Sequence, residues 1–211
     1  MRLLACVTID EQHSRLCGIR IPNRPLAILL ALFQLTVSVA SFLQHAFSYY
    51  KHGHVFLCNS NIFLHNATFE VHILAHDVII FDFGLMHRVL GTDACVANYL
   101  DGGYMRFAWT IEQSSALTLS IVSLAFLPKP LWLLWPGLLM QSSYSLGLSV
   151  LTMATAPKIL EALGGRIDMH LAVIFSIYVF GFCINWMFTF VLWHYYWYRE
   201  RIFSRPPAAQ L

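Results

Sequence analysis

Four long apolar stretches alternate with polar segments along this chain of 211 residues. The clearest one extends from Pro130 to Pro157, where 28 consecutive residues carry no charge. An α-helix rises about 1.5 Å per residue, so about 20 apolar residues cross the hydrocarbon core of a bilayer. Core helices of soluble proteins are usually shorter and keep one polar face. The pattern therefore predicts a membrane-spanning helix over about residues 131–153.

Three further stretches have the same character, which predicts an all-α membrane protein built as a four-helix transmembrane bundle. The second of them keeps one acid near its start, and the last one leads into a run of aromatic residues typical of a membrane–water interface. The predicted organisation is a cytosolic arm at 1–24, a membrane domain at 25–198 and a cytosolic tail at 199–211. The expected spans are 26–47, 107–127, 131–153 and 171–193, with a long lumenal loop at 49–106 between the first two.

One segment of that loop, Phe69 to Leu90, is apolar enough to raise the question of a fifth span. Asp77 and Asp82 interrupt it near its centre. A central acid costs about 2.5–3.5 kcal/mol for membrane insertion. We therefore expect this segment to be an amphipathic element outside the membrane, and a fifth span is the alternative.

Composition supports the membrane interpretation. Hydrophobic residues make up 58% of the chain and charged residues only 11%, whereas soluble domains average about 25% charged. The net charge of +2 is small and scattered, so no nucleic-acid partner is expected. The expected partners are the lipid bilayer, other membrane proteins and a second copy of the chain.

Three signals bear on the orientation in the membrane. Arginine and lysine are densest in the arm, in the link at Lys129 and in the tail, which favours a cytosolic position for both termini. Asn66 begins an Asn-Ala-Thr sequon that is used only on the lumenal or extracellular side. Cys58 and Cys95 lie in the same loop, where they either form a disulfide in an oxidising compartment or remain free thiols.

Polar residues within the predicted spans are the candidate functional residues. Gln34, Gln141 and Asn185 are expected to meet inside the bundle, where hydrogen bonds hold helices together or line a substrate path. Helix association is the favoured interpretation. Glu112 is the one acid within a predicted span, and ionisable groups there are functional hypotheses. Its position near the span's end favours an interfacial acid instead.

The remaining candidates give weaker signals. Seven of the ten histidines lie between His45 and His87, and solvated loop histidines are favoured over a pH sensor or a zinc site. Cys17 is a candidate for palmitoylation because it lies close to the first span. Cys183, in the middle of the fourth stretch, is expected to be an inert packing residue. No catalytic constellation, metal motif or cofactor motif is discernible, so no enzyme activity and no cofactor is expected.

The second half of the chain, residues 130–203, resembles the lysosome-associated four-span family (LAPTM) and its invertebrate relatives. The resemblance rests on the proline- and tryptophan-rich start of the third span, on Gln141 half a span later, and on a charged loop containing Ile159-Leu160-Glu161-Ala162-Leu163. It also rests on the aromatic run from Trp193 to Tyr198 before a basic tail.

The resemblance implies a non-enzymatic trafficking or scaffold protein of endosomal and lysosomal membranes, with the plasma membrane as the other location. A lipid-binding or small-solute transport protein of the same membranes is the alternative. Two features depart from the family pattern. The tail reads Pro206-Pro207-Ala208-Ala209, without the tyrosine of a Pro-Pro-x-Tyr motif, and Gln141 stands where some relatives carry an acid. Neither ligase recruitment nor an acidic sphingolipid contact is therefore implied.

Overall fold

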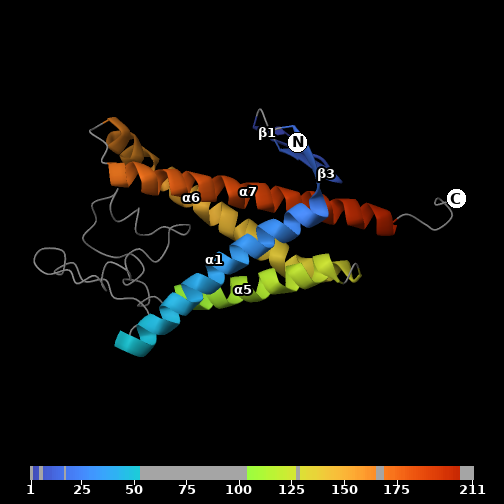
Figure 1. The fold of residues 1–211 in the computed structure, drawn as a ribbon, viewed down its shortest axis with the longest axis horizontal. Coiled ribbons are helices and arrows are strands. Elements are labelled where there is room, and N and C mark those ends of the chain that lie inside the picture. The colour runs from blue at the N-terminus through green and yellow to red at the C-terminus, as the bar shows by residue number, and fades with distance from the viewer. Residues whose placement is uncertain are drawn as a thin grey trace, which may run out of the picture. The chain divides into compact units, whose positions relative to one another are not determined.

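The structure is a computed structural model that describes residues 2–4, 7–16, 18–52, 104–126, 129–164 and 169–204. The chain is mostly helical, which confirms the coarser part of the predicted fold class. The helices are α1 (Asn23–His52), α5 (Tyr104–Ala125), η2 (Leu131–Leu134), α6 (Trp135–Gly164) and α7 (Met169–Ser204), shown in Figure 1.

All four predicted spans fall largely on helices. The helices α1 and α7 extend past both predicted ends, whereas α5 begins before residue 107 and ends at Ala125, inside the predicted span. One clear difference is in α6, which continues to Gly164 although a loop was expected from residue 154. Residues 158–163 are Lys-Ile-Leu-Glu-Ala-Leu, and all of these types except isoleucine are strong helix formers. The helix therefore outlasts the apolar stretch and ends at a glycine.

Whether the helices cross a membrane is a separate question from their existence. Within the described parts of the chain, one helix, Asn23–Lys51, is both long and apolar enough for a membrane span by length and composition. A core helix of a soluble protein can pass the same test. The mostly helical fold is established here, and the four-span arrangement remains a proposal.

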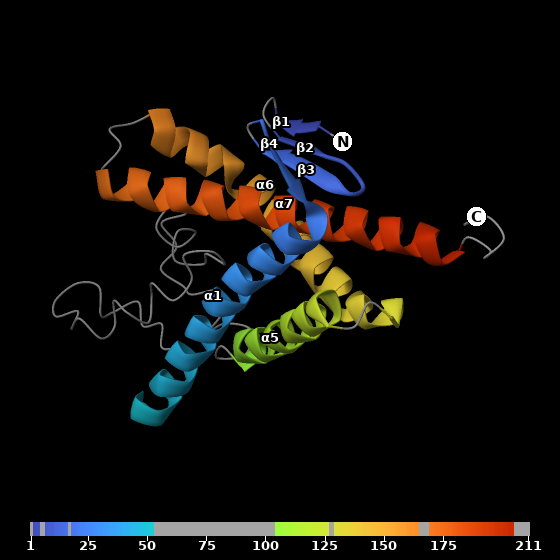
Figure 2. The ribbon, with the colours of Figure 1, turned by 45° about the vertical axis from the view of Figure 1, so that its right-hand side comes forward.

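The first 22 residues form a four-stranded antiparallel sheet, which corrects the all-α prediction for this part of the chain (Figure 2). Neighbouring strands follow one another along the sequence, so the sheet is a simple meander. Its strands are β1 (Arg2–Leu4), β2 (Val7–Ile9), β3 (His13–Leu16) and β4 (Ile19–Pro22). Strands of three or four residues give little alternation to recognise, so the sequence indicated only a polar arm.

Two turns organise the sheet. The β3–β4 turn brings Leu16 opposite Ile19, and Gly18 has φ +91°, a conformation that residues with a side chain rarely adopt. The β2–β3 turn is held by the buried side chain of Asn23, whose amide donates to the carbonyl oxygens of Asp10 and Glu11 at 2.6 and 3.0 Å. Because Asn23 also begins α1, this network fixes the helix start against the sheet.

The chain divides into two compact units. Unit 1 comprises residues 1–36, 113–145 and 184–211, and unit 2 comprises residues 37–112 and 146–183. In the helices, the division falls between residues 36 and 37, 112 and 113, 145 and 146, and 183 and 184. Each long helix therefore contributes one part to each unit.

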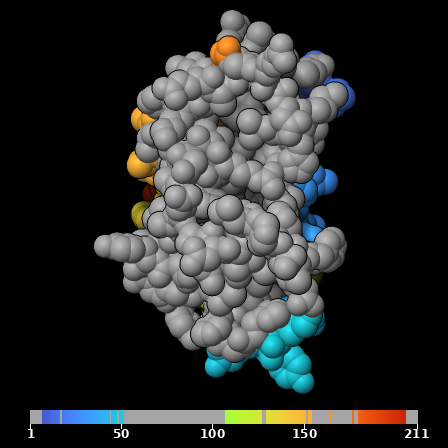
Figure 3. All heavy atoms as spheres, turned by 90° about the vertical axis from the view of Figure 1, so that its left-hand side faces the viewer, coloured from blue at the N-terminus to red at the C-terminus, as the bar shows by residue number. Residues whose placement is uncertain are grey.

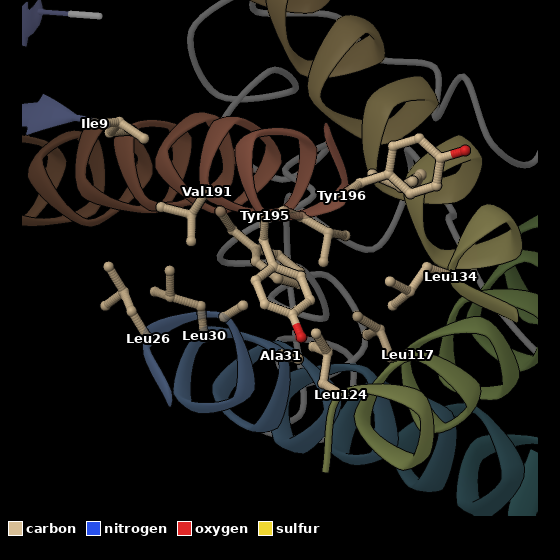
Figure 4. Close-up of a cluster of buried hydrophobic side chains, with 14 residues drawn as sticks. Ile9, Leu26, Leu30, Ala31, Leu117, Leu124, Leu134, Val191, Tyr195 and Tyr196 are labelled. Carbon is tan, nitrogen blue, oxygen red and sulfur yellow. The ribbon is translucent and has the colours of Figure 1, made fainter. Parts of the chain in front are cut away.

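Unit 1 has an apolar core to which the sheet and all of its helical segments contribute (Figure 4). Ile9 comes from the sheet and is fully buried. The helical members of the cluster are Leu26, Ala27, Leu30, Ala31, Leu117, Leu124, Leu134, Leu138, Phe188, Val191, Leu192, Tyr195 and Tyr196. Two helices of this unit approach closely at Gly137, where an added Cβ would lie 1.8 Å from the Ser120 hydroxyl.

In unit 2 the described contacts join α1 to α5. The Ser38 hydroxyl donates to the backbone oxygen of Thr110 at 3.3 Å. The rings of Phe42 and Phe107 stack with centroids 5.3 Å apart. The C-terminal end of α1 is exposed, with Tyr50 at 90% exposure (Figure 3, cyan).

Candidate functional site

Besides Asn23 at the start of α1, unit 1 buries one carboxamide side chain from each of its four long helices. Gln34 comes from α1, Gln113 from α5, Gln141 from α6 and Asn185 from α7, and each is at most 6% exposed. Burying an amide costs free energy unless its hydrogen bonds are replaced. The contacts of these four groups therefore define the candidate site.

The best-connected part of the site lies between α6 and α7. The Gln141 side-chain amide donates to the side-chain oxygen of Asn185 at 3.1 Å and to its backbone oxygen at 3.3 Å. The hydroxyls of Ser145 and Thr189 lie 2.7 Å apart, and Thr189 also donates to the Asn185 backbone oxygen at 2.9 Å. One turn further along α7, the Trp193 indole donates to the Ser142 hydroxyl at 2.9 Å.

Two carboxamide atoms of Gln34 and Gln141 have no hydrogen-bond partner in the described part of the chain. One is the side-chain oxygen of Gln141, and the other is the side-chain nitrogen of Gln34. A buried amide oxygen accepts a hydrogen bond from a hydroxyl, an amide or water, and a buried amide nitrogen donates one. Each atom can therefore bind a polar group that the described residues do not supply.

The predicted intramembrane residues divide into three cases. The structure brings Gln141 and Asn185 together through their side chains. Gln34 is buried, but within the described residues its amide nitrogen makes no hydrogen bond to either of them. Glu112 lies on an exposed side of α5 and has no ion pair or hydrogen bond among the described residues. The sequence reasoning missed the fourth carboxamide, Gln113, because the charge of its neighbour Glu112 was the stronger signal.

Unit 2 also buries polar side chains, and those of α1 and α5 are described here. The Nδ1 atom of His45 lies 2.6 Å from the backbone oxygen of Ser41, one turn earlier in α1. His45 is 1% exposed, and its ring lies 6.4 Å from that of Phe107. The sequence showed His45 as a polar member of the first span, and nothing in the apolar pattern distinguished its buried position.

Charged residues lie near the ends of the unit 1 helices. The Arg24 guanidinium donates to the last carbonyl oxygens of α5, those of Leu124 and Ala125, at 2.8 and 3.0 Å. Cations at this end of a helix also interact favourably with its dipole. Arg201, near the end of α7, forms an exposed ion pair with Glu11. These contacts connect α1 to α5 and α7 to the sheet.

Aromatic rings accompany the charges at this end of α6 and α7. Trp135 packs edge-on against Trp193 and Tyr196, with ring centroids 6.5 and 5.9 Å apart. His194 is the next residue of α7 after Trp193. Burial lowers the pKa of its imidazole, and the negative charges of Glu11 and Asp10 oppose part of that decrease. Tryptophan and tyrosine prefer the interfacial layer of a bilayer, because one end of each ring system is apolar and the other polar.

Several predicted sites lie outside the described residues: the sequon at Asn66, the cysteines Cys58 and Cys95, and Cys17. Most of the clustered histidines also lie there. Within the described ranges, no three His, Cys, Asp or Glu side chains are grouped to hold a metal ion. Cys183 is an exposed free thiol rather than the packing residue expected from its central position in the fourth stretch.

Comparison with known proteins gives one match. No curated protein and no solved structure is similar to the chain at a significant level. A model of a family of unknown function, DUF8774, matches residues 6–204, which include unit 2 and most of unit 1, with the sheet apart from its first strand. The chain belongs to the family of unknown function DUF8774.

Proposed function

We propose that this chain is a non-enzymatic, four-span membrane protein that assembles with other membrane proteins or lipids. The observation that carries the proposal is an inverted distribution of side chains on all four helices. Polar groups are buried beside the apolar core, and many large apolar groups are exposed. Water-soluble proteins show the opposite distribution, and a buried polar group or an exposed apolar face is the informative deviation.

Exposed apolar side chains, the first part of this inverted distribution, are present on every long helix. Leu29, Leu119, Leu146 and Phe180, one residue from each helix, are between 41% and 65% exposed. In the described parts of the four long helices, the large exposed apolar residues are Leu29, Leu32, Phe33, Val39, Leu43, Phe47, Tyr49, Tyr50, Ile111, Leu119, Val122, Trp135, Leu139, Leu146, Val150, Met153, Val179, Phe180, Trp197 and Phe203. Lipid chains would cover such faces without cost.

The buried side of the inversion is hydroxyls and carboxamides rather than charges. Gln141 with Asn185, and Ser145 with Thr189, connect α6 to α7 by hydrogen bonds. In a bilayer, helices associate through close packing and such interhelical hydrogen bonds, because lipid gives them little hydrophobic reason to pair. The close approach of α5 and α6 at Gly137 is of the same kind.

Charge supports an orientation with both termini cytosolic. The basic residues Arg24, Lys129, Arg199 and Arg201 all lie in unit 1, at or beyond the ends of its helices. Short segments rich in arginine and lysine remain on the cytosolic side of membranes. In this orientation the segment between α1 and α5, with the sequon at Asn66, is lumenal.

The location that we propose, endosomal and lysosomal membranes, rests on the resemblance of residues 130–203 to the LAPTM family.

For assembly, Gly147 offers an accessible position on α6, because an added Cβ there would meet no described atom within 4 Å. An exposed glycine allows a helix of another protein to approach closely. We therefore place the partner contact on this part of α6.

Transport of a small polar solute or binding of a lipid is the second candidate. The side-chain oxygen of Gln141 and the side-chain nitrogen of Gln34 favour it, since both are buried, have no hydrogen-bond partner among the described residues, and can bind a polar group. The two functions make different demands on the chain. Assembly needs Gly147 at the surface, and transport needs Gln141 in the interior.

Topology is tested first. Epitope tags at residues 1 and 211 are expected to be inaccessible to antibody in intact cells and accessible after permeabilisation. Opposite accessibility of the two tags would mean an odd number of spans, with residues 69–90 as the additional one.

Asn66→Gln should abolish a glycosidase-sensitive gel shift, and alkylation without reductant should leave Cys58 and Cys95 unlabelled. Labelling of both thiols would exclude the disulfide.

Function is tested with two substitutions on α6. Gly147→Leu should weaken co-purification of membrane partners or retention in endosomes and lysosomes, while membrane insertion remains intact. Gln141→Leu should leave assembly in place. If the protein instead purified as a strict monomer, transported a solute in liposomes, and lost that flux in Gln141→Leu, the scaffold proposal would be wrong and the carrier would replace it.

A further inference from the structure

The sheet carries two arginines directly opposite each other. Strand register pairs Arg15 of β3 with Arg20 of β4, and Thr8 of β2 lies beside Arg15 on the other side. Both arginine side chains are exposed. Cβ atoms of directly opposite residues are about 5 Å apart, and like charges in such pairs are destabilising. The chain therefore has an unfavourable pair of like charges on a surface where uncharged polar residues would avoid the repulsion.

No acid of the described chain compensates this pair. Within the described residues, neither Arg15 nor Arg20 has an ion pair or a hydrogen bond through its guanidinium. The sheet's acids, Asp10 and Glu11, lie in the β2–β3 turn, and Glu11 is engaged with Arg201. The arginines lie toward the other end of the strands, next to the β3–β4 turn. Charge is therefore separated along the sheet, with an uncompensated positive end.

The position of the sheet brings that positive end back toward the apolar helices. At one end of the strands Glu11 pairs with Arg201 of α7, whereas Ile9 joins the apolar cluster that contains Val191. The strands therefore lie alongside the last part of α7 instead of continuing beyond it, as Figures 1 and 2 both show. Ile19, at the β3–β4 turn beside Arg20, is 67% exposed. An exposed apolar residue beside cations is typical of contact with the interfacial layer of a bilayer.

We propose that Arg15 and Arg20 form a binding site for the headgroup of an anionic phospholipid in the cytosolic leaflet. The inference rests on the proposed membrane-spanning function, because the spans hold the sheet at the membrane surface. Guanidinium groups match phosphate and carboxylate oxygens in fork geometry, and an anion between two of them removes their repulsion. The cytosolic leaflet supplies anionic lipid, and each basic residue near it contributes about a fivefold gain in affinity.

The test is a lipid titration of the purified full-length protein in an uncharged detergent. A fluorescent phosphatidylserine and a phosphatidylcholine with the same label are added separately. We expect the wild-type chain to prefer phosphatidylserine by roughly tenfold or more, and Arg15→Gln and Arg20→Gln each to reduce the preference about fivefold. Lys51→Gln, which removes one positive charge at the other end of α1, should leave it unchanged.

Folding is controlled by circular dichroism and by phosphatidylcholine binding, which both arginine variants should retain. If a variant misfolds, the wild-type preference still provides a test, because about 1 M salt should abolish it. Equal binding of the two lipids by the wild-type chain would overturn the inference, as would an undiminished preference in both variants. Complete displacement by an equal concentration of inorganic phosphate would assign the site to a free anion instead. Failure of the topology test with tagged chains would overturn the proposed topology and the assignment to the cytosolic leaflet, whereas the lipid preference in detergent tests the arginine site by itself.

Discussion

The sheet and the helices of unit 1 follow different rules for which side chains are exposed. In the sheet, Ile9 is buried and the charged Arg15 and Arg20 are exposed, with Ile19 at the β3–β4 turn as an exposed apolar residue. The helices bury amides such as Gln141 beside their apolar core, and they expose leucines such as Leu139. The change occurs within one chain and within one compact unit. It is the difference expected if water surrounds the sheet and lipid surrounds the helices.

The transition between the two rules lies at the start of α1. The first buried apolar residues of this helix, between Leu26 and Ala31, belong to the cluster that includes Ile9 of the sheet. Gln34, Ser38, Ser41 and His45 follow at helical spacing on the buried side. The interior of α1 thus becomes polar with distance from the sheet. The burial and the polarity of each side chain, taken together, therefore show better than hydropathy alone which residues lie on the surface of a helix.

The largest expected effect comes from placing an acid on an exposed helix position. Leu146 of α6 is 60% exposed and lies in the charge-free stretch. In lipid, Leu146→Asp should cost about 2.5–3.5 kcal/mol of insertion free energy. The measurement is the fraction of chain that resists carbonate extraction after synthesis into microsomes. Ile19→Asp, on a similarly exposed sheet position, is the control and should extract like the wild-type chain. Equal behaviour of the two variants would remove the distinction between sheet and helices.

The second effect compares the same substitution at two glycines of α6. A Cβ at Gly137 would lie 1.8 Å from the Ser120 hydroxyl, whereas a Cβ at Gly147 meets nothing within 4 Å. Gly137→Leu should therefore destabilise the fold by about 1–3 kcal/mol through overpacking. Gly147→Leu should leave stability within about 0.5 kcal/mol of the wild type. Unfolding by SDS in mixed micelles measures both, and a smaller loss at residue 137 than at residue 147 would contradict the packing described.

The third effect concerns the polar interior. Asn185→Leu removes the side-chain acceptor of Gln141 and should destabilise the helix pair by about 1–1.5 kcal/mol in the same SDS assay. Thr118→Val is a suitable control, because Thr118 is exposed and its hydroxyl donates to the Ser114 oxygen of its own helix. If Asn185→Leu were as stable as the control, the buried amides would have no structural role, and the carrier function would gain support.

The fourth effect is on the sheet side of the comparison. Gly18→Ala places a side chain at φ +91° in the β3–β4 turn, which should cost about 1 kcal/mol. The loss should appear as faster amide hydrogen exchange in residues 7–22, with exchange in the helices unchanged. Gly164→Ala, at a helix end without a positive φ, is the matched control. Equal exchange in both variants would contradict the turn geometry.

The smallest effect is a pH dependence at the boundary between the two regions. Burial lowers the pKa of His194 in the folded state, so the unfolded chain binds a proton at a higher pH than the folded chain does. Stability should fall as the pH drops below about 6.5, the ordinary histidine value, and level off below the folded pKa. His194→Phe keeps an aromatic ring and should flatten part of this slope in thermal unfolding. An unchanged slope would show that His194 is not its source.

The sequence allowed the helices to be predicted but not the sheet. Long charge-free stretches leave few alternatives to a helix, because an extended chain in lipid would leave its backbone groups unpaired. The strands are three or four residues long, and their only strong signal is Gly18 at a turn. The end of α6 was also missed, since good helix formers continued the helix through a charged segment.

The candidate site was only partly accessible from sequence. Glutamine and asparagine stand out in apolar stretches, which is why Gln34, Gln141 and Asn185 were recognisable. Which of them meet depends on the rotation of each helix about its axis, and the pattern does not determine that rotation. Two small residues of α6 show the same limit, because Ser145 contacts α7 whereas a Cβ at Gly147 would meet no described atom.

The most direct test of the central claim is the water accessibility of single cysteines on the exposed helix faces. In a chain without its native cysteines, one residue per helix is replaced in turn: Leu29, Leu119, Leu146 and Phe180. Gln12→Cys, at an exposed position in the β2–β3 turn of the sheet, is the reference. If lipid surrounds the helices, a hydrophilic maleimide should label the Gln12 position in membranes, and the four helix positions should react only after detergent and denaturant are added. Labelling of all four helix positions in intact membranes at the rate of the Gln12 position would contradict the account.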